Sequence, residues 1–433
     1  MTTRTTATVH ATATATAPSV TAQHAAHRDP NVLRWLGAYA SSAVGDNVYY
    51  LALSWAAVQA GTPAQAGLVT ALSAVPRALL MLGGGVVADR YGPRRVLIGS
   101  GAVRCAAVLA VAALLLVGRP GLWPLAALAL VFGAVDAVMM PALGALPPRI
   151  TGRGELARVH GMRGLAVRLA AVVGAPLGGL GVALGGSATA FGLAGLLFAV
   201  SLPLLFAVRV AEPPADDTPE RGTAWSRLTD GLRYLRGDRL LSSLIVVIAL
   251  SDLGFVGPLN VGLTLLADER GWGAGGVGWV LAGFGTGAGA VSLLLTARGH
   301  LPRAGLVLSV SGVVSAVAIG ALAFMPYVAA AAAVALCIGL VSGLNGVLCG
   351  ALLQARSDRA YAGRVTSVSN FFSLGVAPLT FPLTGAAIGL WGTGPVFVVS
   401  AALCGLGGAY GLCSGPLRRA ELPGRPCRAQ PPG

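Results

Sequence analysis

The chain has 433 residues, of which 55% are hydrophobic and only 11% are charged, and its mean hydropathy is +0.75. A soluble domain devotes about a quarter of its residues to charged side chains. This composition excludes an ordinary soluble protein and indicates that most of the chain lies in a lipid bilayer. The net charge of +14 is carried by arginines. In short loops such charge sets membrane orientation, so we expect no nucleic-acid partner.

The first thirty residues are rich in Thr and Ala and contain no continuous apolar run. We expect this segment, 1–30, to be a disordered tail and not a signal peptide. The apolar segments that follow are about twenty residues long, enough to cross a hydrocarbon core of roughly 30 Å. They predict an all-α polytopic membrane protein with twelve spans, at about 33–58, 65–87, 95–117, 122–143, 161–184, 187–209, 240–263, 275–297, 304–325, 328–351, 365–390 and 393–415.

The loops between these spans alternate in charge. The gaps at 61–65, 185–190, 324–327 and 391–394 carry no formal charge. Arginines cluster in four other loops, as Arg90/Arg94/Arg95, Arg149/Arg153/Arg158/Arg163, Arg298/Arg303 and Arg356/Arg359/Arg364. Because Lys and Arg are retained on the cytoplasmic side of a membrane, we expect both termini and the long central loop to be cytoplasmic, and the protein to lie in the cell inner (plasma) membrane.

The chain also has the pattern of a duplication. Ala-Pro-Leu at 175–177 recurs at 377–379, and Asp46 in the first span has a counterpart in Asp252 in the seventh. Repeated halves are typical of transporters. The predicted domains are therefore a six-helix bundle at 31–210, a linker at 211–239, a second six-helix bundle at 240–417 and a tail at 418–433.

Within the linker, an amphipathic helix is predicted by apolar residues at helical spacing, Trp225, Leu228, Leu232 and Leu235. Such a helix is suited to lying on the inner membrane surface. It either has a regulatory role there or simply connects the two halves.

The loop between the second and third spans concentrates one Asp and three Arg in a chain otherwise poor in charge. Glycines allow a sharp turn there, the Asp can accept hydrogen bonds from a helix N-terminus or an Arg, and the arginines hold the turn inside. This loop has the residues Gly85, Asp89, Arg90, Gly92, Arg94 and Arg95.

This loop resembles the signature between helices two and three of the major facilitator superfamily. The resemblance implies a fold of two pseudo-symmetric six-helix bundles, and a latch on the cytoplasmic side in which the Asp and Arg residues join the halves until the cavity opens inward. GDNVYYLAL in the first span, the segment before the fifth span, DGLRYLRGDRL and AGRVTSVSN resemble the macrolide-efflux-like branch of drug:proton antiporters.

A second motif lies in the fifth span, with the residues Gly174, Pro176, Gly178 and Gly179. It resembles, in part, a signature of antiporters. A proline flanked by glycines also permits a kink and close helix packing, which explains these residues without reference to the direction of transport.

Ionisable side chains inside the spans are the candidates for proton coupling, since each costs on the order of 3 kcal/mol to place there. The five candidates are Asp46, Arg77, Arg104, Asp136 and Asp252. Burial raises the pKa of a carboxyl group and a neighbouring Arg lowers it, so Asp46 is the leading candidate, Asp252 is its rival, and Arg77 or Arg104 is the expected partner. The alternative is a permanent Asp–Arg pair that fixes helix packing, which we favour for Asp136.

The resemblance also implies that spans one, four, seven and ten line the substrate cavity. Aromatic and amide side chains there suit a large hydrophobic molecule better than a sugar or phosphate. The candidates are Asn47, Tyr49, Tyr50, Phe255, Asn260 and Asn345.

These features predict an exporter of hydrophobic small molecules, such as an antibiotic, a drug or a secondary metabolite, in exchange for protons. The alternatives are a proton-coupled or facilitative importer of a nutrient and, less favoured, a membrane-embedded enzyme. The sequence contains no GxxxxGK[ST] phosphate loop for ATP and no clustered His, Cys or carboxylate ligands, so we expect no enzymatic activity, cofactor or metal. Substrate, protons and lipid are the expected partners of a monomer.

Overall fold

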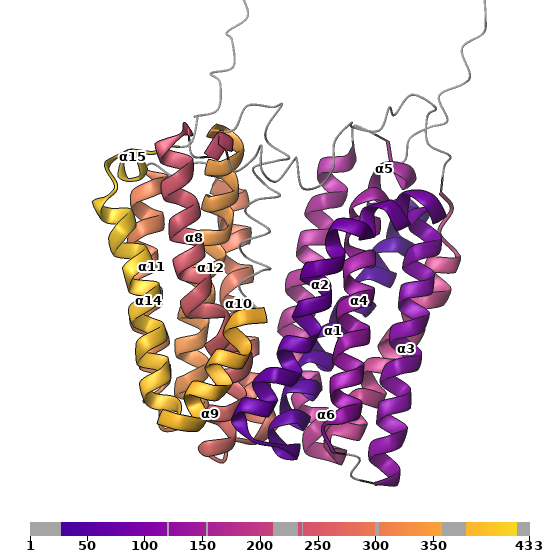
Figure 1. The fold of residues 1–433 in the computed structure, drawn as a ribbon. Helices are drawn as coiled ribbons and strands as arrows, with labels where there is room; N and C mark the ends of the chain where they lie inside the picture. The colour runs from indigo at the N-terminus through magenta and orange to yellow at the C-terminus, as the bar shows by residue number, and fades with distance from the viewer. Residues whose placement is uncertain are drawn as a thin grey trace, which may run out of the picture.

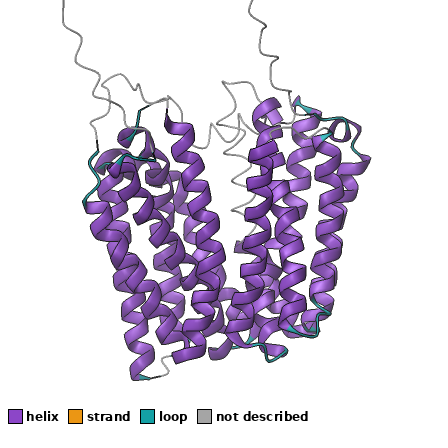
Figure 2. Ribbon diagram, turned by 180° about the vertical axis from the view of Figure 1, so that it is seen from behind, coloured by secondary structure: helices purple, strands orange, loops and turns teal. Residues whose placement is uncertain are grey.

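The structure is a computed structural model that describes residues 27–118, 121–152, 155–210, 233–235, 237–298, 303–356 and 378–421. The regular structure of these residues is helical, and the helices stand in two groups side by side (Figures 1 and 2). Three expectations fall mainly outside the described residues: the disordered N-terminal tail, most of the amphipathic linker helix, including Trp225, Leu228 and Leu232, and the C-terminal tail from residue 422 onward.

The N-terminal half contains six helical elements. They are α1 (Pro30–Ala60), α2 (Pro63–Tyr91), α3 (Pro93–Val117), α4 (Trp123–Ala145), the short α5 (Pro147–Ile150) and α6 (Leu156–Phe206). Proline lies in the first turn of α1 to α5, where its missing N–H costs nothing. Thr62 and Gln65 form a capping box at the start of α2, which satisfies two backbone donors.

Helix α6 contains two spans in one element. Gly185 and Gly186 have non-helical backbone angles, and Gly186 has φ = 73°, a left-handed conformation that glycine adopts without strain. The chain reverses there, so the first arm of α6 corresponds to the predicted fifth span and the second arm to the sixth.

The C-terminal half begins after the linker. Its elements are α8 (Arg239–Gly257), the π-helical turn η2 (Pro258–Gly262), α9 (Leu263–Glu269), α10 (Gly273–Arg298), α11 (Ala304–Leu322), α12 (Val328–Arg356), an unlabelled helix at 378–391, α14 (Thr393–Cys413) and α15 (Gly415–Arg418). Helices α8, η2 and α9 run on from one another, and the π turn starts at Pro258, which cannot donate a backbone hydrogen bond.

Helices occupy the position of every predicted span, in part for the eleventh. Among the described residues, eight helical stretches are long and apolar enough to cross a membrane, and the broken α6 counts once among them. The chain is thus an all-helical polytopic membrane protein. Within the halves α1 packs along α6, α2 on α4, α10 on α12, and α11 on α14.

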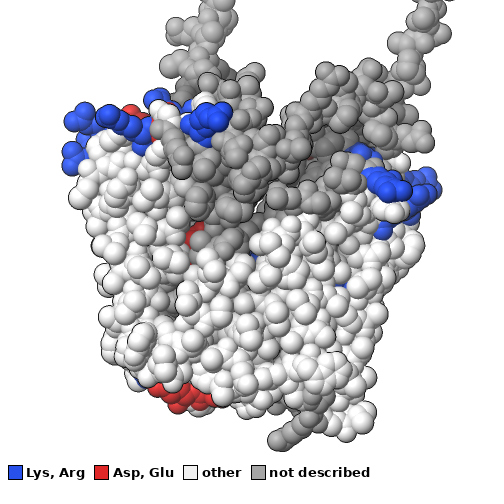
Figure 3. Space-filling view, viewed as in Figure 1, with Lys and Arg blue, Asp and Glu red and all other residues white. Residues whose placement is uncertain are grey.

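The two ends of the molecule differ in charge (Figure 3). One end, the arginine-rich end, carries exposed arginines at the helix ends, including Arg90, Arg95, Arg158, Arg303, Arg356 and Arg418. The opposite end, the acidic end, carries the exposed Asp268 and Glu269 of α9. The first described residues of α1 and the C-terminal α15 both lie at the arginine-rich end (Figure 1).

Backbone-close contacts join the halves toward the acidic end. A Cβ added at Gly67 of α2 would lie 2.5 Å from the carbonyl oxygen of Phe381, and one added at Gly385 would lie 2.4 Å from that of Pro63. The hydroxyl of Ser54 in α1 donates to that of Thr264 in α9 at 2.8 Å. Toward the arginine-rich end the ribbons of the halves diverge (Figure 1).

Candidate functional site

An ion pair lies near the middle of the N-terminal half. Asp46 is close to the centre of α1, and its carboxylate pairs with the guanidinium of Arg104 from α3. The two partners differ in exposure, because the side chain of Arg104 is only 1% exposed whereas that of Asp46 is 27% exposed. The acidic member of the pair is therefore partly exposed, while its basic member is buried.

Aromatic rings and a thioether surround the Arg104 guanidinium. Its central carbon lies 4.5 Å from the ring centre of Phe198 and 5.0 Å from that of Phe132, and Nη1 donates to the sulfur of Met139 at 3.2 Å. Cation–π contacts of this kind are strongest where water is excluded. They fix the position of the guanidinium against Phe132, Phe198 and Met139.

A second carboxylate, which is buried, lies next to this pair. Asp136 of α4 is 5% exposed, and its Oδ2 accepts a hydrogen bond from the hydroxyl of Tyr50 at 3.1 Å. Asp136 also interacts electrostatically with Arg104, and Tyr50 with Arg77. The four predicted N-terminal candidates thus form one charge cluster. It consists of Asp46 of α1, Arg77 of α2, Arg104 of α3 and Asp136 of α4.

The sequence left open whether Arg77 or Arg104 is the partner of Asp46, and the structure places Arg104 there. Arg104 contacts Asp46, whereas Arg77 lies on the side of Tyr50. The Nε of Arg77 is buried and has no hydrogen-bond partner among the described residues. Asp252, the rival of Asp46, lies in α8 near the thiols of Cys349 and Cys404, so it is outside this cluster.

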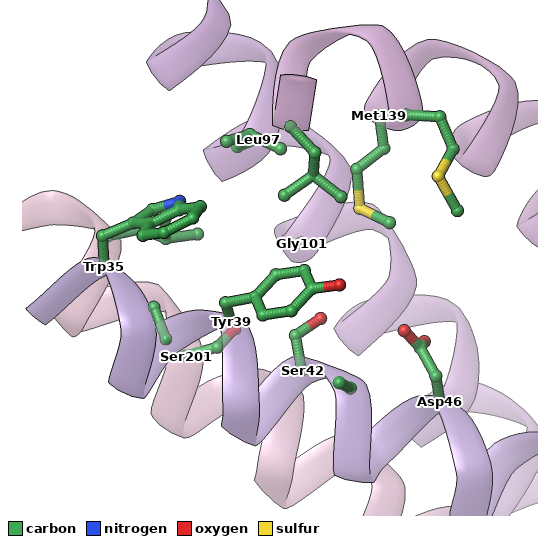
Figure 4. A pocket seen from close by; sticks show the side chains of 13 residues that line it. Trp35, Tyr39, Ser42, Asp46, Leu97, Gly101, Met139 and Ser201 are labelled. Atoms are coloured by element: carbon green, nitrogen blue, oxygen red, sulfur yellow. The ribbon is translucent and has the colours of Figure 1, made fainter. Parts of the chain in front are cut away.

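A pocket within the N-terminal half leads to Asp46 (Figure 4). The space between its walls is about 570 Å³ when the open solvent at its mouth is included. Its lining is mostly apolar, and it comes from α1, α3, α4 and the second arm of α6: Trp35, Ala38, Tyr39, Ser42, Ala43, Asp46, Leu97, Gly101, Met139, Met140, Leu143, Ser201 and Leu205.

The six predicted cavity residues lie in different surroundings. Asn47 and Asn260 each donate to the backbone carbonyl four residues earlier in their own helix. Asn345 accepts a hydrogen bond from Ser311, and Phe255 packs on Phe284 with ring centres 5.8 Å apart.

Tyr49 is fully buried and stacks on Phe132, so it packs inside the N-terminal half, and its neighbour Tyr50 belongs to the charge cluster. None of the six cavity candidates is among the residues that line the pocket.

Comparison with known proteins identifies the family. The family profile described as Major Facilitator Superfamily matches residues 35–377, which is most of the chain. The chain belongs to the major facilitator superfamily. Superfamily members are secondary transporters and not enzymes, as the sequence predicted.

Curated relatives within the superfamily are distant. The enterobactin exporter EntS of Salmonella choleraesuis is 28% identical over 346 residues, which cover 79% of this chain and 81% of the relative. The EntS protein of Escherichia coli O139:H28 is 28% identical over 306 residues, covering 70% of this chain and 72% of the relative. The finer resemblance to the macrolide-efflux-like branch stays a prediction.

Solved structures of the superfamily share the fold. The nucleoside transporter NupG superposes with a TM-score of 0.69 at 11% identity, over 89% of this chain and 98% of that chain. A transporter of the POT family, crystallised with 5-aminolevulinic acid, gives a TM-score of 0.68 at 12% identity, over 90% and 96% of the two chains. At these identities the likeness concerns the fold alone.

The loop that resembles the superfamily signature lies between α2 and α3. Gly92 has φ = 82° and forms the turn, and Arg94 donates to the carbonyl of Phe206 at 2.6 Å, at the C-terminal end of α6 in the same half. The guanidinium of Arg90 lies 5.7 Å from the ring centre of Tyr91, and Arg95 is exposed. The side chain of Asp89 and the surroundings of Gly85 are outside the described part, so the predicted latch stays a prediction.

The antiporter-like residues of the first arm of α6 lie at helix contacts. A Cβ on Gly174 would lie 2.6 Å from the Cβ of Asn47, and one on Gly178 would lie 3.2 Å from the Cα of Val48, both in α1. A Cβ on Gly179 would lie 2.7 Å from the carbonyl oxygen of Ala274 in α10. Together with Pro176, which lies inside the helix, these glycines let the first arm of α6 pack closely on α1 of its own half and on α10 of the other half. Close helix packing was one of the two interpretations of this motif in the sequence.

Two arginines with tertiary contacts were not among the site residues predicted from the sequence. Arg168, in the first arm of α6, donates to the carbonyl of Ala288 in α10 at 3.1 Å, so it joins the two halves. The guanidinium of Arg163 lies 5.1 Å from the ring centre of Tyr39. Their position inside the predicted fifth span was a usable signal, since an arginine within an apolar segment needs a partner.

Proposed function

We propose that this superfamily member exports hydrophobic small molecules in exchange for protons by alternating access, with Asp46 as the proton-carrying group. The observation that carries the proposal is the unequal burial of the Asp46–Arg104 pair. The Asp46 carboxylate lies near the middle of a span and is partly exposed, whereas the Arg104 guanidinium beside it is buried. Such a carboxylate can gain and lose a proton while the positive charge of its partner stays buried.

The passenger is proposed to be an amphipathic secreted molecule of the siderophore kind. The support is the name of the relatives, which are enterobactin exporters and share more than two thirds of their length with this chain. The aromatic and thioether lining around Asp46 also fits a largely apolar ligand with few polar groups.

The arginine-rich end is proposed to face the cytoplasm. The support is the asymmetry of charge between the two ends, which follows the retention of arginine on the inner side. Since the halves meet toward the acidic end, the passenger would reach the space between them from the cytoplasmic side.

Everted membrane vesicles test this proposal. An acid interior drives protons out of such vesicles, so an exporter accumulates ethidium or enterobactin inside them, whereas a proton-coupled importer does not. We expect Asp46→Asn at normal expression to abolish gradient-driven accumulation. Asp252→Asn is the matched control, because Asp252 lies outside the charge cluster, and it should retain accumulation. Full accumulation by Asp46→Asn would remove Asp46 from the mechanism.

A further inference from the structure

One face of the first arm of α6 packs against α10 of the other half. A Cβ added at Gly278 of α10 would lie 2.7 Å from the carbonyl oxygen of Ala175. Further toward the arginine-rich end, a Cβ added at Gly285 would lie 3.2 Å from the backbone nitrogen of Val172. The two helices thus pack backbone to backbone across the boundary between the halves.

This close packing ends at Arg168. A Cβ at Gly289, one turn beyond Gly285 in α10, would lie 3.9 Å from the Cβ of Arg168. Gly164 and Gly161 precede Arg168 by four and seven residues and so lie on the same face of α6. A Cβ added at either glycine would meet no atom of the described residues within 4 Å. From Arg168 toward the arginine-rich end, this face therefore borders open space between the halves, which diverge there (Figure 1).

Arg168 brings a positive charge to this boundary, well inside the membrane-spanning part of the helix. It lies twelve residues after Leu156, the first residue of α6, which is about 18 Å at 1.5 Å per residue. Its side chain is partly exposed, and Nη1 donates to the neutral carbonyl oxygen of Ala288 at 3.1 Å. The charge of Arg168 thus meets a carbonyl and open space.

The two packed helices contain no carboxylate that could compensate this charge. Residues 156–184 of α6 and 273–298 of α10 include no Asp or Glu. The carboxylates of α1 and α4 have partners of their own, because Asp46 pairs with Arg104 and Asp136 accepts a hydrogen bond from Tyr50. An ionised group inside a membrane needs an opposite charge or polar partners. The open space beside Arg168 therefore favours an anion that comes from outside the chain.

We propose that Arg168 binds an oxyanion group of the passenger, so that the protein takes amphipathic molecules with a carboxylate or sulfonate in preference to uncharged or cationic molecules of the same shape. The inference rests on the proposed export function. A guanidinium offers several N–H donors in a planar fork that matches an oxyanion, and the bond to Ala288 uses one of them. Gly161 and Gly164 leave room beside the guanidinium for the apolar part of the passenger.

Two fluorescent probes that share their rings test this preference without any gradient. Anilinonaphthalene sulfonate is an anion, and phenylnaphthylamine is the same molecule without the sulfonate. Both are titrated against the full chain in lipid nanodiscs, with the signal of empty nanodiscs subtracted. We expect Arg168→Gln to weaken binding of the sulfonate at least about ten-fold, as for loss of a hydrogen bond between charged groups, and to leave binding of phenylnaphthylamine unchanged. A parent protein that does not bind the sulfonate would overturn the assignment.

The choice of variants separates the charge of Arg168 from its bond across the halves. Gln loses the charge but keeps an N–H donor for the carbonyl of Ala288. Arg168→Lys keeps the charge without the planar fork and should retain part of the affinity for the sulfonate. Equal weakening of both probes by Arg168→Gln would show that the residue acts through packing of the halves. That result, or an unchanged affinity for the sulfonate, overturns the anion site.

Arg163→Gln is the matched control. Arg163 belongs to the same arm of α6, but it lies five residues earlier and so points about 140° away from Arg168, over the ring of Tyr39. The variant removes the same charge and should bind both probes as the parent does. A loss of sulfonate affinity as large as that in Arg168→Gln would mean that positive charge anywhere on the helix attracts the anion.

A second pair of variants leaves Arg168 in place, in case Arg168→Gln folds poorly. Gly164→Glu adds a carboxylate one turn away in open space, where it pairs with the guanidinium and competes with the sulfonate. Gly164→Gln has the same size without the charge. We expect the Glu variant to bind the sulfonate at least about ten-fold more weakly than the Gln variant, and both to bind phenylnaphthylamine alike. Equal affinities of the two variants for the sulfonate would contradict the anion site.

These binding measurements are independent of proton exchange. If Asp46→Asn kept gradient-driven accumulation, the proposed coupling would fail while an Arg168-dependent affinity for the sulfonate would stand. If the affinity did not depend on Arg168, the anion site would fail and the proposed export would stand.

Discussion

Two adjacent tyrosines of α1 have opposite surroundings. The hydroxyl of Tyr50 donates to Asp136, whereas that of Tyr49 is buried without a hydrogen-bond partner among the described residues. We expect Tyr50→Phe to lower the free energy of unfolding by about 1.5–3 kcal/mol, the range for a hydrogen bond to a charged group. Tyr49→Phe should be neutral or slightly stabilising, because it removes an unpaired polar atom. Thermal unfolding in detergent measures both, and equal losses would contradict the assignment.

The sequence predicted which charges lie in the membrane but not how they pair. Apolar surroundings alone single out Asp46, Arg77 and Arg104, since a charge in such a segment is costly. Whether Asp46 meets Arg77 or Arg104 depends on how α1, α2 and α3 are rotated about their axes, and no local pattern encodes that rotation. The pocket was missed for the same reason, because its walls come from four helices.

Among the helices, α6 has a break that glycine makes possible. Gly186 has φ = 73°, where other L-residues are strained by roughly 1–2 kcal/mol. We expect Gly186→Ala to destabilise the protein by about that amount, measured as a lower midpoint of thermal unfolding.

Gly118→Ala is the matched control for this break. Gly118 has φ = −174° at the end of α3, an extended conformation that alanine adopts easily, and nothing lies within 4 Å of an added Cβ. A similar loss of stability in the two variants would show that backbone conformation at Gly186 is not the cause.

Helix positions were largely predictable, whereas their details were not. Hydropathy placed a span at 187–209, and the structure resumes its helix directly after Gly186, as expected for a short turn without charge. The seventh span was expected to end at 263, but α8 continues through η2 and α9 to Glu269. Periodicity did not show the π turn at Pro258, because it adds a residue to one turn without altering the overall hydropathy.

At the scale of the whole molecule, Gly67 and Gly385 form one of the close backbone contacts between the halves. We expect Gly67→Val to separate the halves at the acidic end, because the new side chain would collide with the carbonyl of Phe381, and a backbone oxygen cannot move aside as a flexible side chain can. Spin labels at Ala64→Cys and Trp391→Cys in a cysteine-free background should report a longer mean distance.

Gly389→Val is the control for this separation. Gly389 lies one turn beyond Gly385 in the helix at 378–391. A Cβ added at Gly389 meets the Cβ of Pro63 at 3.9 Å, which is an ordinary van der Waals contact. The distance between the labels should stay near that of the parent protein. A distance unchanged by Gly67→Val would mean that this contact does not hold the acidic end closed.

Membrane orientation is a further property of the whole molecule. The positive-inside distribution predicts that green fluorescent protein fused after residue 433 will fluoresce, and that alkaline phosphatase fused after Tyr327, in an uncharged loop, will be active. Active phosphatase at the C-terminus would reverse the proposed orientation. Moving arginines from the arginine-rich end to the acidic end should weaken the preference for this membrane orientation.

The depth of Asp46 has an electrical consequence. Asp46 lies near the centre of the 31 residues of α1, so a proton bound there is about halfway through the field across an energised membrane. Moving one elementary charge through 100 mV changes its free energy by about 2.3 kcal/mol, and each leg of the passage through Asp46 carries about half of that. Countertransport of one proton against an uncharged solute would therefore respond to voltage as well as to acidity, and an ionophore that removes the voltage alone would slow it.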